Sequence, residues 1–203
     1  LNIQKMLSFS ELGVGENVLK AIQELGFIEP TRIQQQAIPV LLADETDFIG
    51  LAQTGTGKTA AFGLPILELT DLRIPTTQAL ILAPTRELCV QIANDLAKYG
   101  KFHRAANITA VYGGANIVQQ IRQIKKGSQI VVATPGRLLD LINRGAIDMG
   151  EIRYVILDEA DEMLNMGFKE DIETILERTP ETRRTMLFSA TMPKEIANIA
   201  KRY

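Results

Sequence analysis

Two polar clusters in this sequence have residue types and spacing suited to phosphate chemistry. An apolar run at residues 154–157 ends in three carboxylates within four residues, Asp158, Glu159 and Asp161. Carboxylates at the end of a buried strand lose hydration and repel one another unless a cation or hydrogen-bond donors stabilise them. Upstream, residues 52–59 read Ala-Gln-Thr-Gly-Thr-Gly-Lys-Thr, a glycine-rich loop with a lysine and a hydroxyl. Together the two clusters predict a site for Mg²⁺ and a nucleoside triphosphate.

The glycine-rich loop has the residues that surround phosphate groups in proteins. Gly55 and Gly57 permit the backbone angles and the close approach by which N–H groups of Thr54–Lys58 contact phosphate oxygens. A helix expected to begin near Lys58 directs its positive end at the same charge. Lys58 is placed to reach the β- and γ-phosphates, and the Thr59 hydroxyl to ligate Mg²⁺. The predicted nucleotide-binding residues of the loop are Gln53, Thr54, Gly55, Thr56, Gly57, Lys58 and Thr59.

The loop departs in one position from the strict pattern GxxxxGK[ST]. Ala52 stands where that pattern has its first glycine, and a small residue suffices there. The alternative interpretation is a glycine-rich turn that only opens a helix. Gly63 and Pro65 lie in the helical stretch after the loop, so we expect a kink or an early end of that helix.

Each carboxylate of the second cluster is assigned a separate role. Asp158, the first residue past the strand, is placed to hold Mg²⁺ directly or through water. Glu159 is the candidate that orients or deprotonates an attacking water. Asp161 suits a hydrogen bond with a neighbouring segment, although an N-terminal helix cap is the alternative interpretation. The predicted catalytic residues are therefore Lys58, Asp158 and Glu159, and the predicted metal ligands are Thr59 and Asp158.

Strand-like and helix-like segments alternate along the chain, which predicts an α/β fold with a doubly wound parallel sheet and helices on both faces. Most strand-like runs are nearly continuous in Val, Ile and Leu, which is typical of strands covered on both sides. The expected strands are residues 47–52, 79–83, 108–112, 130–133, 154–157 and 185–188. Amphipathic helices are expected at residues 86–99, 116–126, 137–143 and 169–177, among others.

Polar or glycine-containing segments come directly after all six expected strands. In a parallel sheet these strand ends meet at one edge, where ligands bind in doubly wound folds. The segments are residues 53–59, 84–88, 113–114, 134–137, 158–161 and 189–191. We therefore expect the glycine, hydroxyl, arginine and carboxylate groups of these segments to form one functional surface.

Composition limits the class of protein. The chain has 203 residues, 46% of them apolar, and a formal net charge of −2, so contact with nucleic acid would have to be local. Cys89 is the single cysteine and is expected to be a small buried thiol in a reducing compartment. No leader or membrane-spanning run is evident, which predicts a cytoplasmic protein without membrane contact. The chain is also expected to be a monomer. The chain begins at Leu1 and ends at Tyr203, which suggests a fragment of a longer protein.

Taken together, the motifs resemble those of the DEAD-box RNA helicases, ATPases built from two RecA-like domains. The residues Gly-Phe-Ile-Glu-Pro-Thr-Arg-Ile-Gln at 26–34, with Phe9 upstream, are similar to the Q motif of that family. The resemblance implies that Phe9, Thr31 and Gln34 recognise adenine, with Phe9 stacking on the base. A glutamine amide offers both a donor and an acceptor, as the N6/N7 edge of adenine requires.

The resemblance also defines an expected domain organisation. It implies one RecA-like P-loop domain over residues 1–203, made of a Q-motif region at 1–34 and a P-loop core at 35–203. The second RecA-like domain of the family is absent from this chain. Arginines of that domain reach the γ-phosphate, so the isolated chain is expected to be nearly inactive.

Further segments resemble the family's RNA-contacting and coupling motifs. Hydroxyls, N–H groups beside glycines and guanidinium groups suit sugar–phosphate contacts, and none of them reads a base edge. Sequence-nonspecific binding of single-stranded or short duplex RNA is therefore expected. The implied RNA-binding residues are Pro84, Thr85, Arg86, Gly113, Gly114, Thr134, Pro135, Gly136 and Arg137. The implied coupling residues between hydrolysis and strand separation are Asp161, Ser189 and Thr191.

Several alternatives stay open from the residues alone. Arg86 is equally suited to be a charge on a helix face, and residues 189–191 to close a strand. Arg183 and Arg184 are expected in a solvated turn. The resemblance implies an ATP-dependent RNA helicase domain that uses ATP and Mg²⁺. The competing functions are a non-catalytic scaffold module and a DNA-translocating relative; Gln34 with Phe9, and Ala160, favour the RNA helicase.

Overall fold

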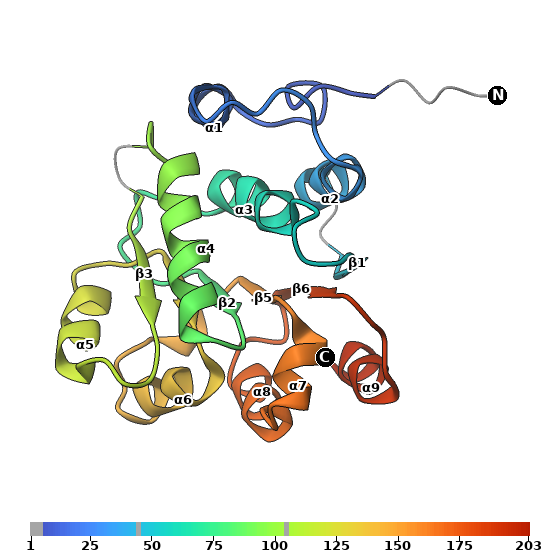
Figure 1. Ribbon diagram of the computed structural model, residues 1–203. Helices are drawn as coiled ribbons and strands as arrows, with labels where there is room; N and C mark the ends of the chain where they lie inside the picture. The colour runs from blue at the N-terminus through green and yellow to red at the C-terminus, as the bar shows by residue number, and fades with distance from the viewer. Residues whose placement is uncertain (1–5, 44–45, 104–105) are drawn as a thin grey trace.

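The computed structural model describes residues 6–43, 46–103 and 106–203, and these form a three-layer α/β structure (Figure 1). A six-stranded sheet has the order β1-β6-β5-β2-β4-β3, with every adjacent pair parallel. The predicted sheet is therefore confirmed, and each expected strand is present with bounds shifted by two residues or fewer. The strands are β1 (Phe48–Leu51), β2 (Ala79–Leu82), β3 (Ile108–Val111), β4 (Ile130–Ala133), β5 (Tyr154–Leu157) and β6 (Arg184–Ser189).

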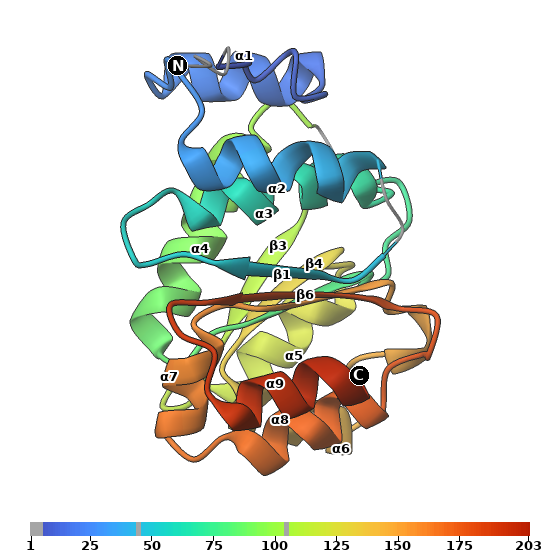
Figure 2. The same cartoon turned by 90° about the vertical axis from the view of Figure 1, so that its right-hand side faces the viewer.

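Helices cover both faces of the sheet (Figure 2). One face carries α2 (Arg32–Ala43), α3 (Lys58–Leu69) and α4 (Arg86–Tyr99), and α1 (Glu16–Glu24) lies outside α2 and α3, farther from the sheet. The other carries α5 (Ile117–Lys125), α6 (Pro135–Asn143), α7 (Ala160–Asn165), α8 (Lys169–Glu177) and α9 (Lys194–Arg202), with a 3₁₀ turn at Met149–Glu151. None of the helices in the described part of the chain combines the length and the apolar character that crossing a membrane requires.

The central strand β2 shows why these strands read as continuous apolar runs. Its four residues are all fully buried. Successive side chains of a strand point to opposite faces, so Ile81 belongs to the core under α1–α4, while Leu80 and Leu82 belong to the core under α5–α9. Both faces of the strand must therefore be apolar, as the sequence pattern predicted.

The helix after the glycine-rich loop differs from the prediction. The early end expected at Gly63 and Pro65 is wrong, because α3 continues to Leu69 with Pro65 inside it, while a kink at these residues stays a prediction. Both residues are buried, and packing on the sheet offsets the backbone hydrogen bond that proline removes. A Cβ atom at Gly63 would lie 2.7 Å from Leu96 Cδ2, so glycine here lets α3 and α4 approach closely.

The expectation of a solvated turn at Arg183 and Arg184 is wrong for Arg184. Its side chain is 6% exposed, and its guanidinium donates to the backbone carbonyls of Thr46 at 2.5 Å and Leu41 at 2.6 Å. These hydrogen bonds hold the C-terminal end of α2 and the residue Thr46, which precedes β1, against the start of β6. No local pattern indicated this role, because the acceptors are main-chain oxygens distant along the chain.

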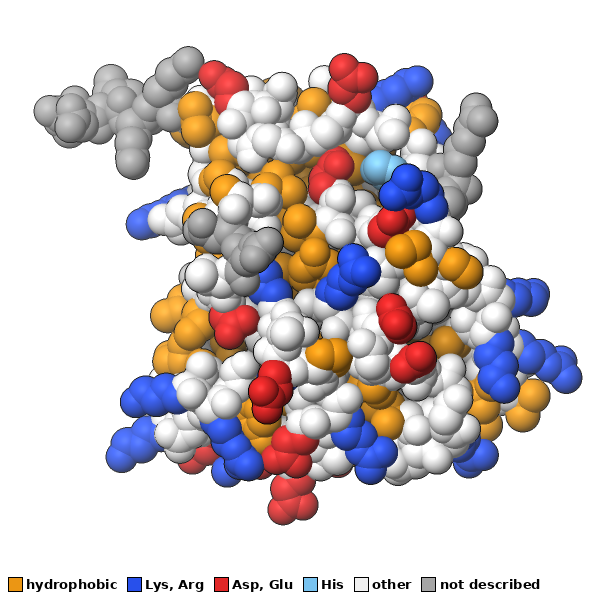
Figure 3. Space-filling model, turned by 180° about the vertical axis from the view of Figure 1, so that it is seen from behind, with side chains coloured by type: hydrophobic (Ala, Val, Ile, Leu, Met, Phe, Trp, Pro, Cys, Tyr) orange, Lys and Arg blue, Asp and Glu red, His pale blue; other side chains and the backbone are white. Residues whose placement is uncertain are grey.

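Charged side chains of both signs are interspersed on one face of the molecule. On the face opposite to the view of Figure 1, Lys and Arg side chains are interspersed with Asp and Glu side chains (Figure 3). This distribution agrees with the net charge of −2 and leaves local contacts, not a broad basic field, to attract an anionic ligand.

Candidate functional site

The glycine-rich loop after β1 adopts the conformation that its glycines permit. Gly55 has φ of 77° and Gly57 has φ of 92°, both in the left-handed region that disfavours other residues. Gly57 is also closely surrounded, since an added Cβ would lie 2.5 Å from Gln34 Nε2 and 2.9 Å from Thr31 Oγ1. The loop then leads directly into α3 at Lys58, so the positive end of that helix faces the loop.

Lys58 and Asp158 face each other across the ends of β1 and β5. Lys58 Nζ lies 3.6 Å from Asp158 Oδ1, and the two side chains are 6% and 3% exposed. The Lys58 ammonium has no hydrogen-bond partner among the residues that the structure describes. A buried cation without a hydrogen bond is costly, and phosphate oxygens of a ligand would supply the missing acceptors.

Burial also perturbs the carboxyl group of Asp158. Desolvation raises the pKa of Asp158 to about 6, against the opposing attraction of Lys58. A cation at this carboxylate would favour its ionised form and offset the cost of its burial.

The residues present fit Mg²⁺ bound together with phosphates. Thr59 and Asp158 line the same cavity, so a hydroxyl and a carboxylate oxygen face a shared space. Within the described ranges no group of three or more His, Cys, Asp or Glu side chains is arranged to hold a metal ion. Mg²⁺ is commonly held by one or two protein oxygens plus substrate phosphates and water, which matches this sparse donor set.

Glu159 adopts an unusual backbone conformation. It has φ of 51° and caps α7, and in the described part of the chain it is the one residue other than glycine with positive φ. Its N–H donates to Asp158 Oδ1 at 3.0 Å. Backbone strain of this kind persists where the surroundings hold it, and it is common at functional sites. The turn places the half-buried Glu159 side chain at the wall of the cavity that Lys58 and Asp158 also line.

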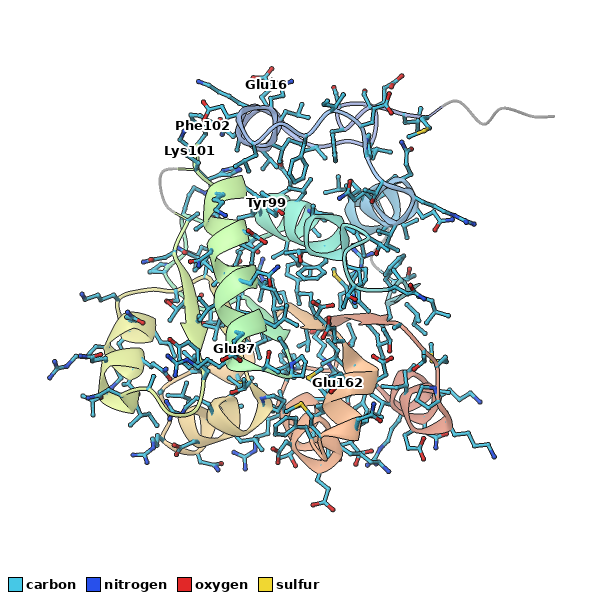
Figure 4. All side chains as sticks on the ribbon, in the orientation of Figure 1. Glu16, Glu87, Tyr99, Lys101, Phe102 and Glu162 are labelled. Carbon is cyan, nitrogen blue, oxygen red and sulfur yellow. The ribbon has the colours of Figure 1, made fainter. Side chains whose placement is uncertain are left out.

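A cavity of about 330 Å³ brings together six of the ten predicted nucleotide-binding residues, namely Gln34, Thr54, Gly55, Gly57, Lys58 and Thr59. The phosphate loop and the carboxylates form one part of its wall, and aromatic and polar side chains from α4 and the Q-motif region form another. It is lined by Phe27, Gln34, Thr54, Gly55, Gly57, Lys58, Thr59, Ala60, Leu88, Gln91, Asp95, Tyr99, Asp158 and Glu159. The Tyr99 side chain lies at the end of α4 beside α3 (Figure 4). Gln53 and Thr56 lie in the loop but do not line this cavity; Gln53 lines an adjoining hollow with Glu159 and Asp161.

The Gln34 amide joins the Q-motif region to the phosphate loop. It is 3% exposed, its Oε1 accepts from the Thr31 N–H at 2.9 Å, and its Nε2 donates to the Gly57 carbonyl at 3.1 Å. One N–H and one lone pair of the amide are left over, which is the donor and acceptor pair that adenine recognition requires. The structure thus adds a role that the sequence did not reveal, a direct link between Gln34 and the loop.

Phe9 is not placed as the resemblance implied. It is 5% exposed, lies in the hydrophobic core and does not line the cavity. Its ring centroid is 6.0 Å from that of Phe27, which does line the cavity and meets Tyr99 edge-on at 5.8 Å. Phe9 therefore packs against Phe27 on the core side, away from the cavity. Phe27 was within the recognised motif, but no pattern in the sequence indicated that its ring, not that of Phe9, faces the cavity.

The segment after β5 is bound to the segment after β6. Thr191 donates to Asp161 Oδ2 through its N–H at 3.0 Å and its hydroxyl at 2.8 Å. The Asp161 N–H in turn donates to Ser189 Oγ at 3.2 Å. Partial burial raises the pKa of Asp161, but hydrogen bonds from Thr191 and Ser189 outweigh it and lower the pKa overall. The hydrogen bond predicted between these segments is present.

The segments after β2, β3 and β4 present the predicted RNA-contacting residues. Pro84 and Pro135 are buried, Thr85 and Thr134 cap α4 and α6, and Gly136 is exposed. Gly113 and Gly114 are exposed, with open space where a side chain would be. The Arg86 guanidinium carbon lies 4.9 Å from the centroid of the Tyr112 ring, and the Arg86 side chain is exposed.

Arg137 is engaged within the protein rather than free in solution. Its Nη1 donates to the Ala115 carbonyl at 3.1 Å and to Gln120 Oε1 at 2.8 Å. Gln120 was missed by sequence reasoning, because a glutamine within an amphipathic helix carries no distinguishing signal. Its burial and its contact with Arg137 become visible only when α5 and α6 are packed together.

A parallel α/β sheet with a phosphate loop, a buried lysine and a carboxylate turn at one edge defines a P-loop nucleotide-binding domain. Comparison with known proteins gives the family. Residues 31–199 match the DEAD/DEAH box helicase family, and the chain belongs to it.

Two similar curated proteins come from bacteria. The chain is 53% identical over 197 residues to the ATP-dependent RNA helicase CshA of Limosilactobacillus reuteri, covering 97% of this chain and 39% of the relative. It is 52% identical over 198 residues to the DEAD-box ATP-dependent RNA helicase CshA of Geobacillus kaustophilus, covering 98% and 42%. The chain therefore spans about two fifths of the length of these relatives.

Solved structures agree with the fold. A DEAD box protein from Methanococcus jannaschii superposes with a TM-score of 0.93 at 47% identity, covering 98% of this chain and 54% of the other. A hypothetical ATP-dependent RNA helicase from Sulfolobus tokodaii gives a TM-score of 0.84 at 42% identity, covering 92% and 54%. The fold is therefore that of a RecA-like domain of a DEAD-box protein.

Proposed function

We propose that this chain is the ATP-binding domain of an ATP-dependent RNA helicase, with residues 1–34 as its Q-motif region and residues 35–203 as its P-loop core. The observation that carries the proposal is the buried Lys58 ammonium, which lacks a hydrogen-bond partner in the described part of the chain and faces Asp158 in the cavity. Such a cation is poised for an anion, and the loop around it has the N–H groups that bind phosphate.

The two protein oxygens proposed for the metal are those of Thr59 and Asp158. When bound, Mg²⁺ would neutralise charge that develops on the phosphate oxygens. Lys58 would act on the same charge as a donor, and N–H groups of residues 54–58 would orient the triphosphate. Gln34 would offer its remaining donor and acceptor to adenine, and Phe27 its ring face.

Glu159 is the proposed group that orients and deprotonates the attacking water. It comes directly after Asp158, and its left-handed backbone turns the side chain to the cavity wall. A carboxylate near the γ-phosphate position can accept the proton that water loses on attack. Asp161, held by Thr191, belongs to the adjoining hollow rather than to this step.

RNA is the proposed partner, bound through its backbone without base selection. The support is the donor chemistry of the exposed Arg86 and of the open glycines 113 and 114. In the intact protein a second RecA-like domain would close over ATP and RNA, and Asp161, Ser189 and Thr191 would couple the two events. The residues 1–203 alone are proposed to bind nucleotide and to hydrolyse it negligibly, and cytoplasmic location stays a prediction.

Titration with Mg²⁺–ADP tests the nucleotide site on this chain. Lys58→Met should weaken binding about 10- to 100-fold, since charge-assisted hydrogen bonds contribute about 1.5–3 kcal/mol. Lys194→Met is the matched control, because it removes the same charge from an exposed position on α9. Equal affinity of Lys58→Met and Lys194→Met would refute the assignment of the site.

A further inference from the structure

Side-chain contacts join the three strand-end segments that are proposed to contact RNA. Arg86 follows β2 and Tyr112 follows β3, and the Arg86 guanidinium carbon lies 4.9 Å from the centroid of the Tyr112 ring. Gln120 Nε2 donates to the Tyr112 carbonyl at 3.2 Å. Arg137, after β4, donates to Gln120 Oε1 at 2.8 Å. A continuous chain of contacts therefore runs from Arg86 through Tyr112 and Gln120 to Arg137.

Gln120 lies in the middle of this series of contacts, and both the nitrogen and the oxygen of its side-chain amide form hydrogen bonds. It is 5% exposed, its NH₂ group donates to a main-chain carbonyl, and its oxygen accepts from a guanidinium. The reverse orientation of the amide would set its NH₂ group against the NH₂ groups of Arg137. The amide orientation is thus fixed, and a buried amide that lost these partners would be costly.

Arg137 is held by one of its two terminal nitrogens. Nη1 has two hydrogens, and these go to the Ala115 carbonyl and to Gln120 Oε1. Nε and Nη2 have no acceptor among the described residues, so three N–H donors stay available, two of them parallel along the edge formed by Nε and Nη2. A guanidinium of this geometry matches a phosphate with two parallel hydrogen bonds.

We propose that Gln120 is a positioning residue for RNA binding: it orients the Arg137 guanidinium toward an RNA phosphate and fixes the 112–115 loop beside it. This inference rests on the proposed function, because RNA binding is itself proposed. Gln120 does not touch RNA; it acts through Arg137. A purely structural role would instead make Gln120 matter for folding and nucleotide affinity, with no specific effect on RNA.

The test uses the intact protein, a labelled single-stranded oligouridylate and a non-hydrolysable ATP analogue. Gln120→Met removes both hydrogen bonds at similar volume, and Gln119→Met is the matched control on the exposed face of α5. We expect Gln120→Met to weaken RNA binding about tenfold. We also expect the slope of log affinity against log salt to fall by about one, as for a lost phosphate contact.

Arg137→Met shows whether the effect passes through the guanidinium. It should reproduce the loss, and the double variant should be no weaker than Arg137→Met alone, because the two residues act as a unit. In ATPase assays of Gln120→Met, the RNA concentration that gives half-maximal ATP hydrolysis should rise about tenfold, while the hydrolysis rate at saturating RNA should equal that of wild type. Gln120→Asn, which keeps a buried amide too short to reach both partners, should behave like Gln120→Met.

Melting temperature and Mg²⁺–ADP affinity report on folding of each variant. RNA affinity of a folded Gln120 variant equal to that of Gln119→Met would overturn the proposal, and so would fully additive losses in the double variant. These results leave the proposed function standing, provided that wild-type protein binds RNA and Arg137→Met weakens it. Absence of RNA binding by the wild-type protein would instead contradict the proposed function itself.

Discussion

The Lys58 ammonium and the Asp158 carboxylate lie 3.6 Å apart with both side chains buried. Because burial is the larger influence, the pKa of Asp158 rises to about 6 even though Lys58 opposes the shift. This pair links the electrostatics of the fold to the proposed binding of a metal–nucleotide complex.

A pH dependence of nucleotide binding is expected from this pKa. Below pH 6 the Asp158 carboxyl is mostly protonated, and above it is ionised and able to ligate Mg²⁺. Mg²⁺–ADP affinity should therefore rise about tenfold between pH 5 and pH 7.5 from this group. Calorimetric titrations across that range measure it. Asp158→Asn is the control, because the phosphates of the ligand still titrate in this variant but the Asp158 carboxyl is gone, so the tenfold change in affinity should be lost. A pH profile of Asp158→Asn equal to that of wild type would contradict the assignment of Asp158 as a Mg²⁺ ligand.

The sheet was predictable because its signals are local. Each buried strand reads as a short Val/Ile/Leu run, and parallel strands bring the segments after them to one edge of the sheet. The glycine-rich loop and the carboxylates could therefore be placed together at that edge from residue patterns, and both line one cavity in the structure. The continuation of α3 through Pro65 was not predictable, because packing on the sheet and the close approach at Gly63 decide it.

Long-range polar contacts account for the other differences. Arg184 bonds to carbonyls more than a hundred residues away, and Arg137 to a loop and a helix that precede it. Phe27, not Phe9, lines the cavity, and which of the two rings does so depends on how they pack against each other and against Tyr99. In the folded structure Lys101 and Phe102, after α4, lie beside α1 (Figure 4), where Lys101 pairs with Glu24 and Phe102 with Lys20.

The Thr191–Asp161 contact predicts a separation of two activities. Thr191→Val removes the hydroxyl that donates to Asp161 at 2.8 Å and keeps the side-chain shape. In the intact protein we expect RNA-stimulated ATP hydrolysis within about threefold of wild type and duplex separation reduced at least tenfold, since a hydrogen bond to a charged group contributes about 1.5–3 kcal/mol. Parallel assays of phosphate release and strand displacement decide it. Equal losses in both assays would show that Thr191 serves hydrolysis itself.

The Arg86–Tyr112 stack predicts a different effect for two substitutions at one position. Tyr112→Phe keeps the ring under the guanidinium and should bind RNA like wild type. Tyr112→Leu removes the cation–π contact, which contributes about 0.5–1 kcal/mol at an exposed site, and should weaken RNA binding about two- to fivefold. Fluorescence anisotropy with the intact protein measures both. A loss in Tyr112→Phe equal to that in Tyr112→Leu would mean that the hydroxyl matters, not the stack.

Cys89 is predicted to be chemically inert in the folded chain. Burial, with a smaller contribution from Glu87, raises the pKa of the Cys89 thiol to about 12, and the side chain is fully buried. Because the thiolate is the reactive form, a thiol-specific disulfide reagent at pH 8 should react with the native chain only as fast as it unfolds. In denaturant the reaction should be complete and rapid. Rapid stoichiometric labelling of the native chain would contradict this prediction, because it would show that Cys89 on α4 is accessible to the reagent.

We propose that Glu159 activates water at a Mg²⁺–ATP site built by this chain. The direct measurement is RNA-stimulated ATP hydrolysis by the intact protein carrying Glu159→Gln, which keeps the size of the side chain and the left-handed backbone position. We predict ATP affinity close to wild type and a hydrolysis rate at least a hundredfold lower, in keeping with the loss of a general base. Hydrolysis by Glu159→Gln at the wild-type rate would contradict the claim.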